Sequence, residues 1–128
     1  MKKSTTINTT YLNWFEENNP DPLDLLLLPT PNSWESLGYL HWYGAGTVGT
    51  PIVMKLLQKW PEQYQAQLVC HYGTMLQLSL TESPSNLDEA FTLAWVQIAI
   101  APCTVLLPGV SLREHDSSLI RAKTLVFA

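Results

Sequence analysis

Charged residues are scarce in this sequence: they make up 14% of its 128 residues, whereas an average soluble domain contains roughly 25%. Hydrophobic residues make up 46%, which is enough to build one core without disulfides or metal ions. This apolar set includes five tryptophans and five tyrosines, so either the core is large or part of the surface is apolar. The composition therefore predicts a soluble domain that binds a protein partner or associates with itself.

Basic residues form no cluster. Seven basic residues stand against eleven acidic ones, which gives a net charge of −4. They are scattered along the chain as Lys2, Lys3, Lys55, Lys59, Arg113, Arg121 and Lys123. A nucleic-acid-binding protein needs a concentrated positive face that neutralises phosphates and releases counterions. The sequence therefore predicts no direct nucleic-acid binding, and its mild acidity favours a basic partner.

No long hydrophobic run is present. Lys2 and Lys3 resemble the start of a signal peptide, but residues 4–10 are polar except for Ile7, so no hydrophobic region follows. The leucine run Leu25–Leu28 is far shorter than the about 20 residues that cross a bilayer. We therefore expect a cytoplasmic protein without membrane contact.

Cysteine is rare as well, with only Cys70 and Cys103 in the chain. Two cysteines in a cytosolic chain are more typical of buried free thiols than of a disulfide, although a fold that brings them together would allow a bridge. Cys70 and His71 resemble a nucleophile beside its base. On a strand, however, neighbouring side chains point to opposite faces and cannot meet. The pair is therefore predicted to be structural.

Four segments carry helical patterns, marked by caps and by apolar residues at helical spacing. They are a short amphipathic helix after Thr9-Thr10, a helix from Pro51 to Trp60, a helix from its N-cap Ser85 to about Ala101, and a final helix that opens with the capping box Ser111–Glu114. Over residues 91–101 the only polar side chains are Thr92 and Gln97, so the third helix is predicted to be buried nearly all round.

Five segments are predicted as strands: Leu23–Leu28, Leu37–Tyr43, Ala66–Tyr72, Met75–Thr81 and Thr124–Phe127. The third and fourth join at Gly73 as a hairpin, with Leu76, Leu78 and Leu80 on one face. The predicted fold is α+β, a single compact domain over residues 1–128 with a mostly antiparallel sheet, a buried long helix and amphipathic helices packed on it. Residues 1–22 are expected to form an N-terminal helical arm, and residues 23–127 the core.

A glycine motif stands in the middle of the chain: Gly44, Gly46 and Gly49 match the G-x-G-x-x-G pattern of dinucleotide-binding loops. That fingerprint needs a strand before it, a helix after it and an acidic residue about 20 positions on. The expected strand Ala66–Tyr72 offers no Asp or Glu, so the third condition fails. We therefore predict that the three glycines shape the backbone of a connecting segment and bind no cofactor. The alternative is a nucleotide or small-molecule binder, with an enzyme as one form, that uses these glycines and the helix N-terminus at Pro51.

Other constellations of reactive residues are weak. His41, His71, His115 and Cys103 have no metal-ligand spacing. Acidic pairs lie near predicted helix ends: Asp88-Glu89 is explained by the positive end of the helix dipole, and Glu114 by the capping box. Neither Ser83 nor Ser85 stands in a G-x-S-x-G motif. The prediction is therefore against an enzyme and against a metal site.

Four aromatic residues gather just before the glycine segment: Trp34, Tyr39, Trp42 and Tyr43. One interpretation is that they fill the core. The other is an aromatic contact surface, because tryptophan and tyrosine are enriched among the residues that dominate binding energy at interfaces. We predict these four residues as the partner-binding site.

The order of these elements resembles a bacterial family, the domain-of-unknown-function 4253 family. The matching residues are Leu25–Leu28 with Pro29-Thr30, Trp34-Glu35, Tyr39-Leu40, the glycine segment to Pro51, Leu56-Leu57, Trp60, Tyr64, Ala66, Thr74–Leu78, Leu87–Ala90 and Leu93-Ala94. The resemblance covers residues 23–127 and rests on the ordered set. It implies a fold and a bacterial or phage origin, and it implies no activity.

The chain departs from the family pattern at its polar positions. The family's glycine segment has a Gly-Trp-Asn-x-Cys-Pro-like ending, where this chain has Thr47, Val48, Gly49 and Thr50 before Pro51. The family's long helix contains a Glu-Gln pair and then Cys-Pro-Asp. Here the corresponding stretches read Val-Gln at 96–97 and Ala-Pro-Cys at 101–103. Most polar residues of a shared site are thus absent.

The function predicted from the sequence is a non-enzymatic intracellular interaction protein. Its most concrete form is an immunity or anti-defence protein that sequesters a protein partner. Four observations support this prediction: the small size, the mild acidity, the excess of apolar residues and the lack of a catalytic constellation. The nucleotide or small-molecule binder is the alternative, and a purely structural homodimer is a third reading.

Overall fold

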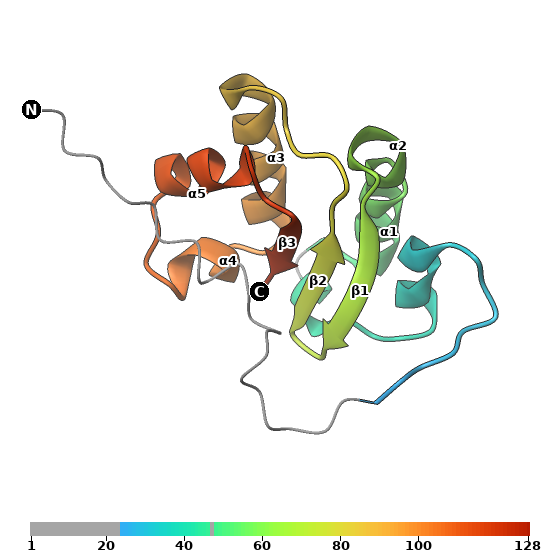
Figure 1. The fold of residues 1–128 in the computed structure, drawn as a ribbon. Coiled ribbons are helices and arrows are strands. Elements are labelled where there is room, and N and C mark those ends of the chain that lie inside the picture. Colours follow the sequence, from blue (N-terminus) through green and yellow to red (C-terminus); the bar gives the residue numbers. More distant parts are fainter. Residues whose placement is uncertain (1–23, 47) are drawn as a thin grey trace, which may run out of the picture.

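A three-stranded antiparallel sheet runs through the middle of the molecule. The computed structural model describes residues 24–46 and 48–128, so the helical arm expected over residues 1–22 lies outside the described residues. The strands are β1 (Gln67–Tyr72), β2 (Met75–Ser79) and β3 (Thr124–Phe127), in the order β1-β2-β3. Figure 1 shows α3, α4 and α5 on the β3 side of the sheet and α1 and α2 on the β1 side. The predicted α+β class and antiparallel sheet are confirmed.

The helical elements fall into two groups along the chain. Before the sheet come the 3₁₀ helices η2 (Ser33–Gly38) and η3 (Tyr43–Gly46), then α1 (Thr50–Leu57) and α2 (Trp60–Tyr64). Between β2 and β3 come α3 (Leu87–Ile100), α4 (Cys103–Leu106) and α5 (Leu112–Leu119). The single helix expected over 51–60 is therefore two, because Pro61 stands in the first turn of a new helix, where its missing N–H costs nothing.

The β1–β2 hairpin forms as predicted. Tyr72 pairs with Met75 across a turn in which Gly73 has a φ of 69°, a conformation that glycine adopts without strain. On β2 and just beyond it, Leu76, Leu78 and Leu80 are buried, which confirms the predicted apolar face. A register shift between Leu68 and Cys70 marks a bulge in β1.

Two of the five predicted strands are wrong. Residues 24–28 have no regular secondary structure, and Leu23 lies outside the described residues. Residues 37–43 span the end of η2, a connection and the start of η3. The apolar and aromatic composition favoured strands, but composition describes a fit to a half-buried sheet surface and not an intrinsic backbone preference. Beside β1, the Ser33 side chain takes the backbone N–H of Leu68, and neither segment pairs with the strand.

Helix α3 begins and ends near the predicted positions. Its N-cap is Asn86 and not Ser85: the Asn86 side chain accepts the backbone N–H of Glu89 at 2.9 Å, and the Ser85 hydroxyl donates to the Glu89 carboxylate at 2.7 Å. The helix stops before Pro102 as expected. The expected burial nearly all round is wrong, because Phe91 and Trp95 are exposed and stack on each other with ring centroids 6.4 Å apart.

The capping box that opens α5 is confirmed. The backbone N–H of Ser111 donates to the Glu114 carboxylate at 2.9 Å, and the Ser111 hydroxyl accepts the N–H of Glu114 at 3.3 Å. These bonds satisfy backbone groups that a helix N-terminus otherwise leaves unpaired. The box fixes where α5 starts and so places His115 one turn later inside the protein.

The centre of the core is aromatic. Phe127 on β3 meets Trp42 edge to face at 6.0 Å between ring centroids and stacks on Trp60 at 5.6 Å. Trp42 has no exposed surface, and its indole N–H donates to the backbone carbonyl of Thr74 at 3.0 Å. These contacts join the segment before η3, helix α2, the hairpin turn and the last strand in one cluster.

A buried polar network holds the other side of β3. The side-chain amide of Gln97 donates to the carbonyl of Val126 at 2.5 Å, and its oxygen lies 3.0 Å from Nε2 of His115. Because the Gln97 oxygen can only accept, Nε2 of His115 carries the proton that it donates. The Thr104 hydroxyl accepts the backbone N–H of Ala128 at 3.0 Å, so α3, α4 and α5 all anchor the chain end.

We predict that Trp42→Ala lowers the free energy of unfolding by about 3–5 kcal/mol, because it opens a cavity in the core and removes the indole bond to Thr74. The matched control is Trp95→Ala, which removes a side chain that is 59% exposed and should cost about 1 kcal/mol or less. Urea unfolding of both variants measures the difference. Equal losses would mean that Trp42 does not form part of the core.

A second prediction concerns acid stability. Burial lowers the pKa of His115 to about 4, although the nearby Asp116 carboxylate partly opposes this shift. The folded state therefore favours the neutral ring, while the unfolded chain takes up a proton near pH 6.5. The contribution of His115 to the free energy of unfolding is therefore complete above pH 6.5. It is lost as the pH falls toward 4, by up to about 3 kcal/mol.

Urea unfolding at intervals from pH 7 to pH 4 checks this expectation. His115→Gln keeps an N–H donor for Gln97 but cannot titrate, so its unfolding free energy should depend less on pH in that window. His41→Gln changes an exposed histidine and should leave the pH dependence unchanged. A wild-type curve that is flat between pH 6.5 and 4 would contradict the prediction.

Candidate interaction surface

The four aromatic residues predicted to bind a partner do not stay together. Trp42 is wholly buried in the aromatic core, and Trp34 is partly buried against that core. Tyr39 and Tyr43 are on the surface, 56% and 68% exposed. A side chain with no exposed area cannot contact a partner in this conformation. The partner-binding prediction therefore remains for Tyr39, Tyr43 and the partly buried Trp34, and it no longer includes Trp42.

An apolar hollow of about 540 Å³ lies beside β1. Its walls come from the chain before η2, from η2 and the connection after it, and from the whole outer strand. The lining residues are Asp24, Leu25, Leu26, Leu28, Ser36, Leu40, Leu68, Val69, Cys70, His71 and Tyr72. A hollow of this volume with mostly apolar walls is within the range of sites that take a ligand or a partner's side chains.

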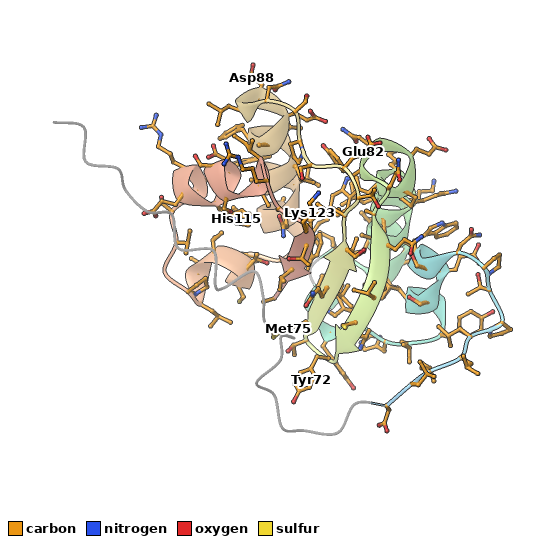
Figure 2. All side chains as sticks on the ribbon, viewed as in Figure 1. Tyr72, Met75, Glu82, Asp88, His115 and Lys123 are labelled. Carbon is orange, nitrogen blue, oxygen red and sulfur yellow. The ribbon has the colours of Figure 1, made fainter. Side chains whose placement is uncertain are left out.

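One tyrosine lines this hollow, and two more are close to it through the chain or a backbone bond. Tyr39 precedes Leu40, which lines it, and Tyr72 lines it directly and is 55% exposed. The backbone N–H of Tyr43 donates to the carbonyl of Gly73 at 3.1 Å, so Tyr43 lies at the turn that follows Tyr72. Figure 2 shows Tyr72 at this turn end of the hairpin, close to Met75. We call Tyr39, Tyr43 and Tyr72 with the hollow the tyrosine surface.

The backbone around η2 fixes the floor of this surface. The Ser33 hydroxyl accepts the N–H of Leu68 at 3.1 Å and ties the start of η2 to β1. The Ser36 hydroxyl donates to the carbonyl of Ser33 at 2.6 Å inside the same helix. His41 and Tyr43 then meet edge to face, with ring centroids 4.8 Å apart. The tyrosine surface is therefore built on anchored backbone.

Cys70 and His71 are not positioned as a catalytic pair. Cys70 lies opposite Gln77 and His71 opposite Leu76 in the hairpin, so their side chains are on opposite faces of the sheet, as expected for strand neighbours. Burial raises the pKa of the Cys70 thiol, which keeps it protonated and less reactive. Nδ1 of His71 accepts the N–H of Gly73 at 3.2 Å. Both residues shape the hollow.

Both cysteines are free thiols, in agreement with the sequence prediction. Cys70 is half-buried, as expected for a structural residue of the pair with His71, whereas the prediction of a buried thiol is wrong for Cys103, which is exposed at the start of α4. Cys103 directly follows Pro102, the residue that separates α3 from the short helix α4.

Among the described residues, no group of three or more His, Cys, Asp or Glu side chains could hold a metal ion.

Backbone geometry accounts for two of the three motif glycines. A Cβ on Gly44 would overlap the indole ring of Trp42, so this position needs a residue without a side chain. Gly49 has a φ of 85° and is the N-cap of α1, where a left-handed conformation favours glycine. Gly46 has open space around it. The strand that a dinucleotide fingerprint needs before the motif is replaced by the end of η2.

Sequence reasoning missed two parts of the surface. The leucines of residues 25–28 were expected in a buried strand, yet Leu25 and Leu27 are 89% and 86% exposed. Tyr72 was placed on a strand but not in a contact surface. The signal for Tyr72 was its position next to the hairpin turn, because connecting segments run over the protein surface. No helix in the described part of the chain is long and apolar enough to cross a membrane.

Comparisons with known proteins give one family. The model of a family described as Domain of unknown function (DUF4253) matches residues 24–128, which is most of the chain. No curated protein and no solved structure gives a significant match. The match agrees with the resemblance read from the ordered motifs.

The glycine geometry generates a third prediction. Gly44→Ala should lower the free energy of unfolding by about 1–3 kcal/mol, because the new methyl group overpacks against Trp42. Gly46→Ala is the matched control, since an added Cβ there meets nothing within 4 Å. Thermal unfolding of both variants measures the effect. An unchanged melting temperature for Gly44→Ala would show that the segment can move away from the indole.

Proposed function

The chain belongs to the Domain of unknown function 4253 family, and we propose that it is a non-enzymatic interaction protein that binds a protein partner through the tyrosine surface. The observation that supports this proposal is an apolar hollow lined by Tyr72, together with the exposed Tyr39 and Tyr43; each of the three tyrosines is more than half exposed. Large apolar areas on the surface of a small domain are typical of interaction sites.

Tyrosine suits this role for a physical reason. Its ring gives a large contact area, its hydroxyl keeps a hydrogen bond when water leaves, and only two side-chain torsions become fixed on binding. An apolar side chain of the partner that enters the hollow would be surrounded by Leu40, Leu68 and Val69. The tyrosines would then shield that contact from water, an arrangement in which a few residues carry most of the binding energy.

The groups around the hollow support binding more than chemistry. Both Cys70 and His71 line the hollow, but the Cys70 thiol has a raised pKa and the two side chains lie on opposite faces of the sheet, so they cannot act together. Asp24 is the only acidic side chain among the described residues that line the hollow. Catalysis by acid–base transfer would need paired titratable groups within hydrogen-bond reach of a substrate. The lining offers mainly shape and apolar contact.

The most concrete form of this proposal is an intracellular immunity or anti-defence protein that sequesters its target by covering it. A net charge of −4 and Asp24 at the hollow support a basic target. The nucleotide-binding alternative at Gly44, Gly46 and Gly49 stays a prediction. It gains no support from the geometry, since the backbone already explains two of these glycines.

The fourth prediction tests the tyrosine surface. Tagged protein is used to capture partners from lysate of its source cell, and the captured partner is purified and titrated against variants. Tyr43→Ala should weaken binding by about tenfold or more, because a hot-spot residue contributes 2 kcal/mol or more. Combining it with Tyr39→Ala and Tyr72→Ala should weaken binding further, while the melting temperature changes little.

Phe91→Ala is the control, since it removes an exposed aromatic side chain from α3, far from the hollow in the sequence and on the other side of the sheet in Figure 1. It should leave the affinity unchanged. If Phe91→Ala weakens binding and the tyrosine variants do not, the partner binds α3 and the proposed surface is wrong. If no stoichiometric partner is captured and a metabolite stabilises the protein instead, the interaction function itself fails.

A further inference from the structure

Strand β1 is an outer strand of the sheet, and its residues 68–72 line the hollow. Figure 1 shows the strand at the edge of the sheet, with β2 on its other side. An outer strand turns part of its main-chain N–H and C=O groups to the side where no strand follows. The groups of β1 that are open on this side therefore decide what can bind along the hollow.

The hydrogen bonds of the sheet show that the main chain of His71 points to this open side. In an antiparallel sheet, the N–H and C=O of successive residues point alternately to one side of the strand and to the other. The Gln97 side chain donates to the Val126 carbonyl, which therefore points away from β2. Gln77 lies opposite Val126, so its main chain points toward β1 and meets that of Cys70. His71 comes next, and its N–H and C=O point away from the sheet.

Both ends of this open edge are closed, and His71 lies between them. The Ser33 hydroxyl accepts the N–H of Leu68 at 3.1 Å, and the Gly73 carbonyl accepts the N–H of Tyr43 at 3.1 Å. Residues 69–72 remain between these two bonds, which is about 13 Å of strand. No described residue forms a hydrogen bond with the outward N–H or C=O of His71. One donor and one acceptor are thus open beside an apolar hollow.

We propose that the partner enters the hollow as an extended segment of about four residues that adds to β1 as a short antiparallel strand. One residue of the partner then lies opposite His71 and exchanges both main-chain hydrogen bonds with it. A helix could not do this, because it uses its main-chain groups for its own hydrogen bonds. This strand addition rests on the proposed partner-binding function and defines the shape of the partner's contact.

The walls of the hollow favour a particular side-chain pattern in this segment. Side chains of a strand point alternately to its two faces, so every second residue of the partner can turn toward the same wall. Leu28, Leu40 and Leu68 are among the lining residues, and they offer apolar contact. Valine, isoleucine or leucine at every second position of the partner segment would therefore gain the most from this surface.

The charges around the hollow favour a basic segment. The segments that form the walls are 24–28, 33–40 and 67–72. They contain two carboxylates, Asp24 and Glu35, and no lysine or arginine. Hydrogen bonds from Thr30 and Asn32 lower the pKa of Glu35, which stands next to the lining residue Ser36 and is charged at neutral pH. Charge complementarity therefore selects a partner segment with a lysine or arginine and disfavours an acidic one.

The experiment uses a phage-displayed library of twelve-residue peptides, selected against the full chain. We expect selected peptides with alternating apolar residues and a lysine or arginine. One selected peptide is then synthesised with a single N-methyl group at each position in turn. The modification should weaken binding by about fivefold or more where the peptide N–H pairs with the His71 carbonyl. It should have little effect at the two neighbouring positions, whose N–H groups point away from β1.

Two variants of the protein test the same contact from the other side. His71→Pro removes the outward N–H and leaves the bonds between β1 and β2 in place, because proline is tolerated on an edge strand where its nitrogen faces outward. His71→Ala is the matched control, since it removes the same imidazole but keeps the N–H. The peptide should bind His71→Pro about fivefold or more weakly than His71→Ala. Circular dichroism and melting curves check that both variants fold.

Strand addition is ruled out if no peptide is selected, if the effect of N-methylation does not alternate along the peptide, or if folded His71→Pro and His71→Ala bind the peptide equally. The N-methyl series decides alone if His71→Pro does not fold. Failure of the proposed function gives a different pattern, in which Tyr43→Ala leaves the affinity of the captured partner unchanged. If Tyr43→Ala weakens that partner and His71→Pro does not, the function stands and strand addition is wrong.

Discussion

The packing of Phe127 between Trp42 and Trp60 is the contact on which the rest of the structure depends. The phenylalanine comes from the last strand, and the two tryptophans come from segments that precede the sheet in the chain. Trp42 is also fixed from the side by its bond to the Thr74 carbonyl in the hairpin turn. Three parts of the chain that are far apart in sequence therefore become one core, and neither half of the chain has this core alone.

The burial of Trp42 decides what its neighbours can do. Once the indole is inside, Gly44 must be a glycine, because any side chain there would meet the ring. Tyr39 and Tyr43 flank the buried residue on the outside of the turn and remain exposed. The glycine motif and the aromatic cluster, which the sequence presents as two separate candidate sites, are thus two consequences of one packing contact. What remains on the surface is the part able to bind.

Elements with local signals could be predicted from the sequence, and elements that depend on distant contacts could not. Gly73 marks the hairpin turn, Ser111 and Glu114 mark the start of α5, and Pro102 marks the end of α3, because each signal acts within a few residues. Residues 24–28 have the composition of a buried strand, but burial needs a neighbouring strand that the sequence does not reveal. The same limit hid the hollow, whose walls come from three segments brought together by the fold.

Side chains bond backbone groups on both outer strands of the sheet. At β3, the Gln97 and Thr104 side chains occupy the outer carbonyl of Val126. At β1, the bulge breaks the ladder and Ser33 takes the N–H of Leu68. One backbone group on each outer strand is thus bonded by a side chain, which limits strand pairing at that position.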